Sequence, residues 1–184
     1  MKEAVLVIDM LNDFVTGKLK CERAQPIIPN IARLNKVARQ NNVDVIYLND
    51  AHLASDFELT KWGPHAMKGT LGAQVIDELK PKKTDYVLEK RTYSGFFETG
   101  LDPLLRNLKV EKVYLTGLHT HMCARHTAAD AFFRGYKIVA VEDGLQAFTE
   151  KDHRDGLEYF QNYNAQVKKV DDIVKEWKGQ VKVK

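Results

Sequence analysis

The sequence predicts an α/β fold in which a parallel sheet is covered by helices on both faces. Six short apolar runs rich in branched residues are spaced along the chain, and helical patterns lie between them. Repeated strand–helix alternation is typical of a parallel sheet, because each new parallel strand needs a crossover connection. The 184 residues contain no repeat, low-complexity stretch or Pro/Gly-rich linker, so we expect a single domain over residues 1–184.

The expected strands are continuous apolar segments rather than alternating ones. Residues 4–8 read AVLVI, which is typical of a strand buried on both faces. Four similar runs follow, and a sixth is weaker. The predicted strands are residues 4–8, 43–48, 86–88, 112–116, 136–141 and 165–170.

The expected helices carry apolar residues at the spacing of one helix face. In the first of them these residues are Ile31, Leu34 and Val37, and Pro29 suits the first turn. Gly135 is expected to end an Ala-rich helix. The predicted helices are residues 29–40, 101–108, 122–134, 150–163 and 171–177.

Two connections, residues 9–26 and 50–71, are unusually long for a compact domain. Long connections of this kind are usually functional or mobile. Residues 178–184 (KGQVKVK) are expected to form a flexible tail.

Composition excludes several classes of protein. The hydrophobic fraction is 44% and the charged fraction 29%, which excludes wholesale disorder. The net charge of +3 is small and spread along the chain, so we expect binding neither to nucleic acid nor to an anionic membrane surface. No apolar run approaches the ~20 residues that a membrane-spanning helix requires. The chain passes from Met-Lys-Glu directly into a predicted strand, so we expect no secretory signal. With two cysteines only, we expect reduced thiols and a cytoplasmic location.

Polar residues follow the predicted strands at their carboxyl ends, where open parallel sheets bind ligands. Asp9 follows the first strand, Lys90 the third and Cys123 the fourth. With the strand order 3-2-1-4-5-6, the first and fourth strands flank the point at which the order reverses. Asp9 and Cys123 then become neighbours, and Lys90 reaches in from farther along the edge. The sequence therefore predicts an acid, an amine and a thiol in one crevice.

These three groups suit nucleophilic catalysis. A thiol at a helix N-terminus beside an ammonium group is favoured as the thiolate. Asp9 can accept the thiol proton and later deliver it to a leaving amine, and backbone N–H groups of residues 119–123 can stabilise an oxyanion. Each residue alone has a structural alternative: Cys123 as a small buried hydrophobe, Asp9 as a turn cap and Lys90 as a surface amine. Cys21 lies in a polar loop without an apparent partner, and we expect it to be structural.

A second group of polar residues follows the second strand, in Asp50-Ala51-His52. Residues two apart on an extended segment point the same way, so both side chains can bind one ion, and His65 can arrive from the next connection. Two imidazoles and a carboxylate suit Zn²⁺ or Fe²⁺. The structural alternative is Asp50 as a turn former, with both histidines as hydrogen-bonded loop residues.

The motifs around these residues resemble those of the isochorismatase-like cysteine hydrolases, and most of all their nicotinamidase branch. They run in family order along almost the whole chain. They are VIDMLNDF (7–14), DAH (50–52), WGPH (62–65), KGT (68–70), EKRTYSGF (89–96), TGL (116–118) before Cys123, TAADA (127–131) and VED (141–143).

The resemblance implies a three-layer α/β/α fold with a six-stranded parallel sheet and a Cys–Asp–Lys triad of Cys123, Asp9 and Lys90. It also implies a non-proline cis peptide bond between Leu118 and His119, and an oxyanion hole formed by the N–H groups of His119 and Cys123. The implied reaction is hydrolysis of a small carboxamide. Nicotinamide and water giving nicotinate and ammonia, as in NAD salvage, matches best.

The resemblance further implies a metal cofactor held by Asp50, His52 and His65. Zn²⁺ is the first expectation, with Fe²⁺ or Mn²⁺ as alternatives. In nicotinamidases this ion takes the ring nitrogen of the substrate.

We expect four residues in the substrate pocket: Phe14, Trp62, Tyr93 and His121. Phe14 and Trp62 match aromatic positions on either side of the substrate ring. The expected partner is therefore a small-molecule amide, and the family's assembly implies a homodimer or homotetramer.

Three residues depart from the family pattern. Leu11 replaces the usual Gln, His121 replaces Asp or Asn, and Ala66 replaces the Cys of many nicotinamidases. None is a member of the triad, so hydrolysis is still expected, and the departures bear on the choice of substrate. Isochorismatases proper carry Gly at the nucleophile position, so Cys123 argues against their ether cleavage.

The sequence leaves three alternatives open. A related cysteine hydrolase would act without metal on a carbamoyl or ureido amide. A phosphorelay receiver domain also places Asp and Lys at strand ends, but it needs paired acids after the first strand, where Asp9 is followed by Met10. A catalytically inactive binding protein would keep the fold without the reaction.

Overall fold

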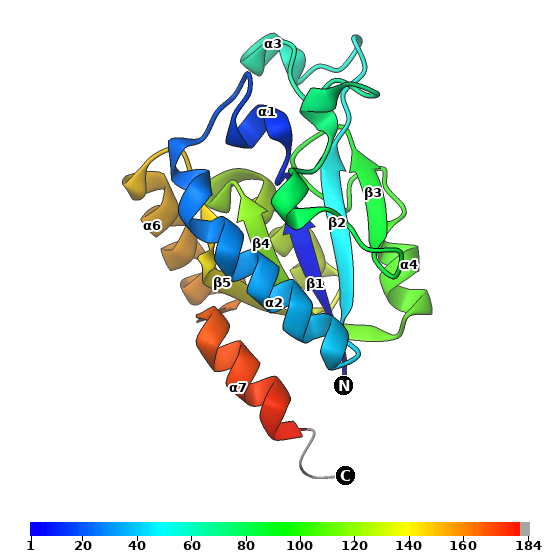
Figure 1. The fold of residues 1–184 in the computed structure, drawn as a ribbon, viewed down its shortest axis with the longest axis vertical. Helices are drawn as coiled ribbons and strands as arrows, with labels where there is room; N and C mark the ends of the chain where they lie inside the picture. Colours follow the sequence, from blue (N-terminus) through cyan, green and yellow to red (C-terminus); the bar gives the residue numbers. More distant parts are fainter. Residues whose placement is uncertain (181–184) are drawn as a thin grey trace.

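The computed structural model describes residues 1–180, and for residue 180 the backbone alone. Its centre is a six-stranded sheet in the order β3-β2-β1-β4-β5-β6, with every neighbouring pair parallel (Figure 1). The predicted fold class and strand order are confirmed. The strands are β1 (Lys2–Ile8), β2 (Asp44–Asp50), β3 (Tyr86–Lys90), β4 (Val110–Leu118), β5 (Lys137–Gln146) and β6 (Gln166–Lys168).

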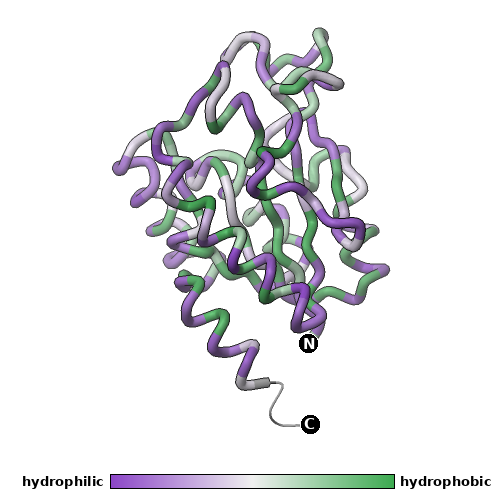
Figure 2. Tube along the Cα trace, in the orientation of Figure 1, coloured by the Kyte–Doolittle hydropathy of each residue, from purple (hydrophilic) through white to green (hydrophobic). Residues whose placement is uncertain are grey.

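Helices cover both faces of the sheet, because the central strands are apolar on both sides. In β1, Val5 and Val7 belong to the core on one face, whereas Leu6 and Ile8 belong to the core on the other. The first face is covered by α2 (Ile28–Gln40) and α7 (Val170–Gln180), and the second by α4 (Leu101–Asn107), α5 (Arg125–Phe133) and α6 (Glu150–Tyr159). Figure 2 shows the hydrophobic residues concentrated along the central strands.

The long connections contain short helices that the sequence did not predict. Figure 1 shows α1 and α3 above the sheet, at the carboxyl ends of the strands, whereas η3 packs against α2. These elements are α1 (Asn12–Val15), the 3₁₀ segment η1 (Glu22–Ile27), α3 (Leu59–Trp62) and the 3₁₀ turns η2 (Leu71–Ala73) and η3 (Asp77–Leu79).

Two predicted helices contain π-helical turns. The helix expected over 122–134 begins earlier, with the π-helical turn η4 (Thr120–Ala124) before α5, and the helix expected over 150–163 ends in the π-helical turn η5 (Phe160–Asn164) after α6. Both turns shift side chains relative to a regular helix, and such turns are frequent at functional sites. Residues 178–180 of the expected tail form the last turn of α7, and residues 181–184 lie outside the described residues.

Gly117 allows the two central strands to approach at the point that positions the site. Its φ is +102°, and a Cβ atom there would lie 1.9 Å from the carbonyl oxygen of Ile8. Only glycine tolerates both conditions. Because Asp9 follows Ile8 and the nucleophile turn follows Gly117, this contact brings the two chemical groups together.

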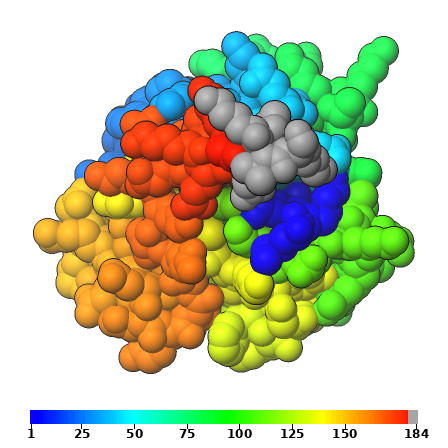
Figure 3. Space-filling view, turned by 90° about the horizontal axis from the view of Figure 1, so that it is seen from below, coloured from blue at the N-terminus to red at the C-terminus, as the bar shows by residue number. Residues whose placement is uncertain are grey.

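The opposite end of the sheet is closed by α7. The Trp177 indole donates a hydrogen bond of 2.7 Å to the buried carboxylate of Glu3, which also accepts from the Tyr114 hydroxyl and pairs with Lys112. Seen from below, α7 and the first residues of the chain lie at the same end of the molecule (Figure 3). Within residues 1–180, no helix combines the length and the apolar character that crossing a membrane requires.

Candidate active site

The structure brings Asp9, Lys90 and Cys123 together at the carboxyl edge of the sheet, and all three are buried. The Lys90 Nζ atom lies 2.8 Å from Asp9 Oδ2 and 3.7 Å from Cys123 Sγ. Lys90 ends β3, two strands away from β1, and its side chain crosses the end of β2, where it lies 2.5 Å from Asp50 Oδ1. The sulfur and the carboxylate oxygens of Asp9 and Asp50 lie within 4.8 Å of one another.

The Asp9 carboxylate is held by its own backbone and by β2. Asp9 has a φ of +52°, which non-glycine residues seldom adopt, and its N–H donates a hydrogen bond of 3.0 Å to the Leu48 carbonyl oxygen. Its Oδ1 atom accepts a hydrogen bond of 2.8 Å from the Asp50 N–H. This leaves Oδ2 directed at Lys90 and the thiol.

Burial determines how the three groups hold their protons. It raises the pKa of the Asp9 carboxyl to about 7, with nearby Asp50 adding to the rise and Lys90 opposing it. It also raises the pKa of the Cys123 thiol well above its ordinary value, although Lys90 acts to lower it. Burial lowers the pKa of Lys90, but Asp50 and Asp9 outweigh it and raise the pKa well above its usual range. Desolvation therefore has a larger effect on the thiol than the adjacent ammonium, and it favours the protonated thiol over the thiolate.

Four side chains beside the triad form a group that can hold a metal ion. Donor atoms of Asp50, His52, His65 and Glu58 all lie within 4.8 Å of one another. The His52 Nε2 atom is 3.7 Å from Asp50 Oδ2 and 3.9 Å from Glu58 Oε1. The sequence predicted three of these residues and missed Glu58, which precedes the short helix α3 and has no fixed spacing from the other ligands.

The imidazoles of this group are oriented by hydrogen bonds on their outer sides. His52 Nδ1 lies 3.1 Å from Asp56 Oδ2, and His65 Nδ1 donates to the Gly63 carbonyl oxygen at 2.8 Å. The inner atoms His52 Nε2 and Glu58 Oε2 are buried without a hydrogen-bond partner. Buried imidazole and carboxylate donors with unpaired inner atoms fit a divalent transition metal such as Zn²⁺.

Asp13 fixes the connection that carries His65. Its Oδ2 atom accepts a hydrogen bond of 2.8 Å from the Ala66 N–H. A Cβ atom at Gly72 would lie 2.2 Å from the same carboxylate, so this close approach requires glycine. The contact ties the connection between β2 and β3 to α1.

A small pocket lies between the triad and the possible metal ligands. Trp62 donates a hydrogen bond of 2.9 Å to the Tyr93 hydroxyl, and its ring stacks against Phe148 with centroids 6.1 Å apart. Among the described residues, the lining contains carboxylates and histidines but no arginine or lysine. The lining residues are Phe14, Leu19, Asp50, Glu58, Trp62, His65, Tyr93, His119, Met122, Cys123 and Phe148.

Several predicted residues lie elsewhere or contribute differently. His121, expected in the pocket, is half-buried and lies outside its lining, whereas His119, expected to contribute its backbone N–H, also lines the pocket with its side chain. The peptide bond between Leu118 and His119 is cis, as the resemblance implies.

Two further residues differ from what the sequence indicates. Cys21 is buried, and its sulfur donates to the Ala147 carbonyl oxygen at 3.3 Å, whereas the sequence shows no partner for it. Phe148 follows β5 and was not predicted, because nothing in the sequence indicates that this turn folds over the pocket.

Known proteins match the chain over nearly its whole length. The family model described as "Isochorismatase domain" matches residues 3–172. A Bacillus subtilis protein named "Uncharacterized isochorismatase family protein PncA" is 34% identical over 175 residues, which cover 88% of this chain and 96% of that protein.

Solved structures are similar in both fold and sequence. The structure of N-carbamoylsarcosine amidase from Thermoplasma acidophilum is 42% identical, has a TM-score of 0.88 and covers 93% of this chain and 98% of its own. The structure of the nicotinamidase/pyrazinamidase PncA from Bacillus subtilis is 33% identical, with a TM-score of 0.87, and covers 92% of this chain and 100% of its own.

Proposed function

The chain belongs to the isochorismatase domain family, and we propose that it is an amidohydrolase that cleaves a small uncharged carboxamide through Cys123, with nicotinamide as the first candidate. The observation that carries the proposal is the geometry of the triad. Lys90 contacts Asp9 and Cys123 at the wall of a pocket lined by aromatic rings. A receiver-domain function has no support in a chain of this family.

The proposed reaction begins with proton transfer within the triad. Asp9 takes the proton of the Cys123 thiol as the sulfur attacks the amide carbonyl carbon, because the raised pKa of Asp9 suits a general base near neutral pH. The N–H groups of His119 and Cys123 are proposed to bind the oxyanion of the tetrahedral intermediate. Lys90 stabilises the carboxylates of Asp9 and Asp50 without giving up its own proton.

The remaining steps return the site to its resting state. Asp9 gives its proton to the departing nitrogen, so ammonia leaves and a thioester to Cys123 remains. Water then attacks the thioester with Asp9 as general base, and the carboxylic acid and the free thiol are released. The sum is amide plus water giving acid plus ammonia.

Asp50, His52, His65 and Glu58 would hold a divalent metal ion beside the pocket. When bound, such an ion supplies a Lewis acid that orients a ring nitrogen or another lone pair of the substrate. Elemental analysis of the dialysed protein should find about one zinc, iron or manganese ion per chain. A His65→Ala variant that retains the ion would contradict this ligand set.

The pocket lining favours an uncharged aromatic substrate. Phe14, Trp62 and Phe148 can contact a flat ring, and the lining that residues 1–180 form contains no arginine or lysine that could pair with a carboxylate of the substrate. The second candidate is an N-carbamoyl substrate, which the similarity to the N-carbamoylsarcosine amidase structure favours.

Both thiols are free, and we propose the cytoplasm as the location.

Ammonia release from a panel of amides tests the function. We expect wild-type protein to turn over nicotinamide and pyrazinamide faster than N-carbamoylsarcosine or a simple ureido acid. Cys123→Ala should bind the same amides and release no ammonia, whereas Cys21→Ala, which removes the other buried cysteine, should retain turnover. Unchanged turnover in Cys123→Ala would refute the mechanism, and preference for the carbamoyl substrates would favour the second candidate.

A further inference from the structure

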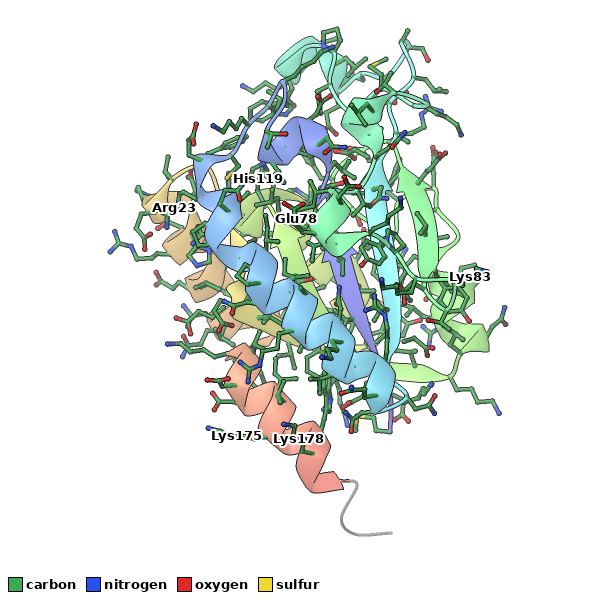
Figure 4. The ribbon with its side chains drawn as sticks, viewed as in Figure 1. Arg23, Glu78, Lys83, His119, Lys175 and Lys178 are labelled. Atoms are coloured by element: carbon green, nitrogen blue, oxygen red, sulfur yellow. The ribbon has the colours of Figure 1, made fainter. Side chains whose placement is uncertain are left out.

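His119 is a buried histidine whose ring lines the pocket beside the nucleophile. It is only 2% exposed, and neither of its ring nitrogens has a hydrogen-bond partner in the structure. Figure 4 labels it at the carboxyl edge of the sheet, close to α1. Buried polar groups nearly always have partners, so two unpaired nitrogens on one ring need an explanation.

The other buried histidines of the described residues each have a partner on at least one nitrogen. His52 and His65 are held through Nδ1, as described above. His153 Nδ1 lies 2.8 Å from the Thr120 hydroxyl. Among the buried histidines of the described residues, His119 alone has both ring nitrogens unpaired; the half-buried His121, which does not line the pocket, also has a buried Nδ1 without a partner.

Two aromatic rings hold the His119 imidazole in place. It stacks on Phe148 with ring centroids 4.0 Å apart and an interplanar angle of 28°, and it meets Phe14 edge to face with centroids 5.9 Å apart. The ring is thus fixed at the pocket wall. Burial lowers the pKa of His119 to about 3, so near neutral pH the imidazole is uncharged and offers one N–H donor and one acceptor.

We propose that His119 is a specificity-determining residue, which hydrogen bonds a second polar group of the substrate in addition to the amide that is cleaved. This inference rests on the proposed amidohydrolase function. The substrates it favours are small carboxamides that carry a further hydrogen-bond donor or acceptor, such as a ring amino or hydroxyl group. A substrate with such a group pairs a nitrogen that is unpaired in the free protein, and it therefore gains binding free energy over a substrate without one.

The test compares matched amino- and methyl-substituted nicotinamides at each free ring carbon. An amino and a methyl group have similar size, so the ratio of their kcat/KM values reports hydrogen bonding. For wild-type protein we expect at least one ring position where the amino compound is preferred by roughly tenfold or more. In His119→Phe, which keeps an aromatic ring against Phe148, that preference should fall to within about twofold.

Two further variants complete the test. His119→Gln retains hydrogen-bonding groups and should keep part of the preference for the amino compound. It also provides a test if His119→Phe does not fold. His126→Phe removes an exposed imidazole whose Nδ1 already bonds the Met122 carbonyl, and it should leave the preference unchanged.

Failure of this inference is distinguishable from failure of the proposed function. If wild-type protein releases ammonia and His119→Phe shows the same preference for the amino compound as wild type, the role of His119 is overturned and the amidohydrolase function stands. Wild-type protein that prefers the amino compound at no ring position also overturns it. Wild-type protein that releases ammonia from no amide overturns the proposed function and, with it, the inference.

Discussion

At the scale of single residues, the site depends on charges that the protein holds out of water. Lys90 is 1% exposed and lies between the carboxylates of Asp9 and Asp50. A buried ammonium needs such partners, because desolvation would otherwise favour its neutral form. The two carboxylates differ in turn: burial and the charge of Asp50 raise the pKa of Asp9 to about 7, whereas Lys90 and His52 outweigh burial and lower the pKa of Asp50. The acid with the raised pKa is the one suited to exchange protons.

An Asp9→Asn substitution tests this assignment. The asparagine amide keeps an oxygen that can accept from the Asp50 N–H, so the variant should fold, but it has no carboxylate to accept the thiol proton. We expect ammonia release to fall by roughly 10²- to 10⁴-fold, with an unchanged circular dichroism spectrum. Turnover within about threefold of wild type would show that another group acts as the base.

Asp56 is expected to control metal affinity without touching the ion. Its carboxylate lies 3.1 Å from His52 Nδ1 and so orients the opposite nitrogen towards the proposed ligands. Asp56→Ala should weaken zinc binding by roughly 10- to 100-fold, measured by competition with a chromophoric chelator. Arg91→Ala is the matched control, because it removes the cation that pairs with Asp56 but leaves the carboxylate against His52. Equal zinc affinity in wild type and Asp56→Ala would contradict the role.

At the scale of elements, the sequence predicts the site residues whose positions are determined by the strands of the sheet. Apolar runs identify the strands, and the strand order places Asp9, Lys90 and Cys123 at one edge, because Asp9 directly follows β1, Lys90 ends β3 and Cys123 lies in the turn η4 after β4. Glu58 and Phe148 could not be predicted in the same way. Glu58 lies in the long connection before β3 and Phe148 in the turn after β5, and their positions depend on tertiary contacts such as that of Asp13 with Ala66 rather than on a local pattern.

The docking of α7 depends on one buried side chain. Trp177 is 2% exposed, packs edge to face on Tyr114 with ring centroids 5.1 Å apart and donates to Glu3. Trp177→Ala should lower the free energy of unfolding by about 3–5 kcal/mol, because it leaves a cavity and an unpaired carboxylate oxygen.

Urea unfolding followed by circular dichroism measures this loss, since the substitution removes a fluorescent reporter. Trp177→Phe retains most of the packing and loses only the hydrogen bond, so it should cost about 2 kcal/mol. A loss below about 1 kcal/mol in Trp177→Ala would show that α7 contributes little to the stability of the sheet.

At the scale of the whole molecule, a groove of about 1000 Å³ opens beside the pocket, between α5 and the connections after β2 and β3. Phe57, Phe97 and Phe133 on its lining are 87%, 56% and 78% exposed. Exposed aromatic clusters of this kind are typical of protein interfaces. The charged residues that line the groove are of both signs, which suits a self-complementary surface. They are Lys61, Lys68, Lys90, Arg91, Asp56, Glu58, Glu89, Glu98 and Asp130, and Lys68 and Arg91 also pair with Glu89 and Asp56 of their own chain.

This surface predicts that a second copy of the chain covers the groove, in the homodimer or homotetramer expected from the sequence. Light scattering after size-exclusion chromatography should give at least twice the mass of one chain for the wild-type protein. Phe133→Glu should shift the mass to that of one chain. Tyr163→Glu changes an aromatic residue that is 69% exposed and outside the groove, and should leave the mass unchanged. A wild-type protein with the mass of one chain would refute the interface.

The pH dependence of stability reports the burial of His119 in the whole fold. The pKa of its imidazole is about 3 in the folded protein, whereas the ordinary value of 6.5 applies to the unfolded chain. The unfolded chain therefore binds the proton first, and the stability associated with neutral His119 is lost as pH falls below about 6.5. His121, Asp50, Lys90 and Asp152 act on the same group, and the raised pKa of Asp9 has the opposite effect in this pH range.

Comparing the free energies of unfolding of wild type and His119→Phe isolates the contribution of His119, because both proteins contain the other titrating groups. In His119→Phe the acid-linked loss disappears. The free energy of unfolding of the variant, relative to wild type, should rise by about 2 kcal/mol between pH 8 and pH 5. Urea unfolding at both pH values measures this difference. A relative stability that does not change with pH would mean that His119 titrates normally in the folded protein, which requires an imidazole open to water rather than one enclosed between Phe148 and Phe14.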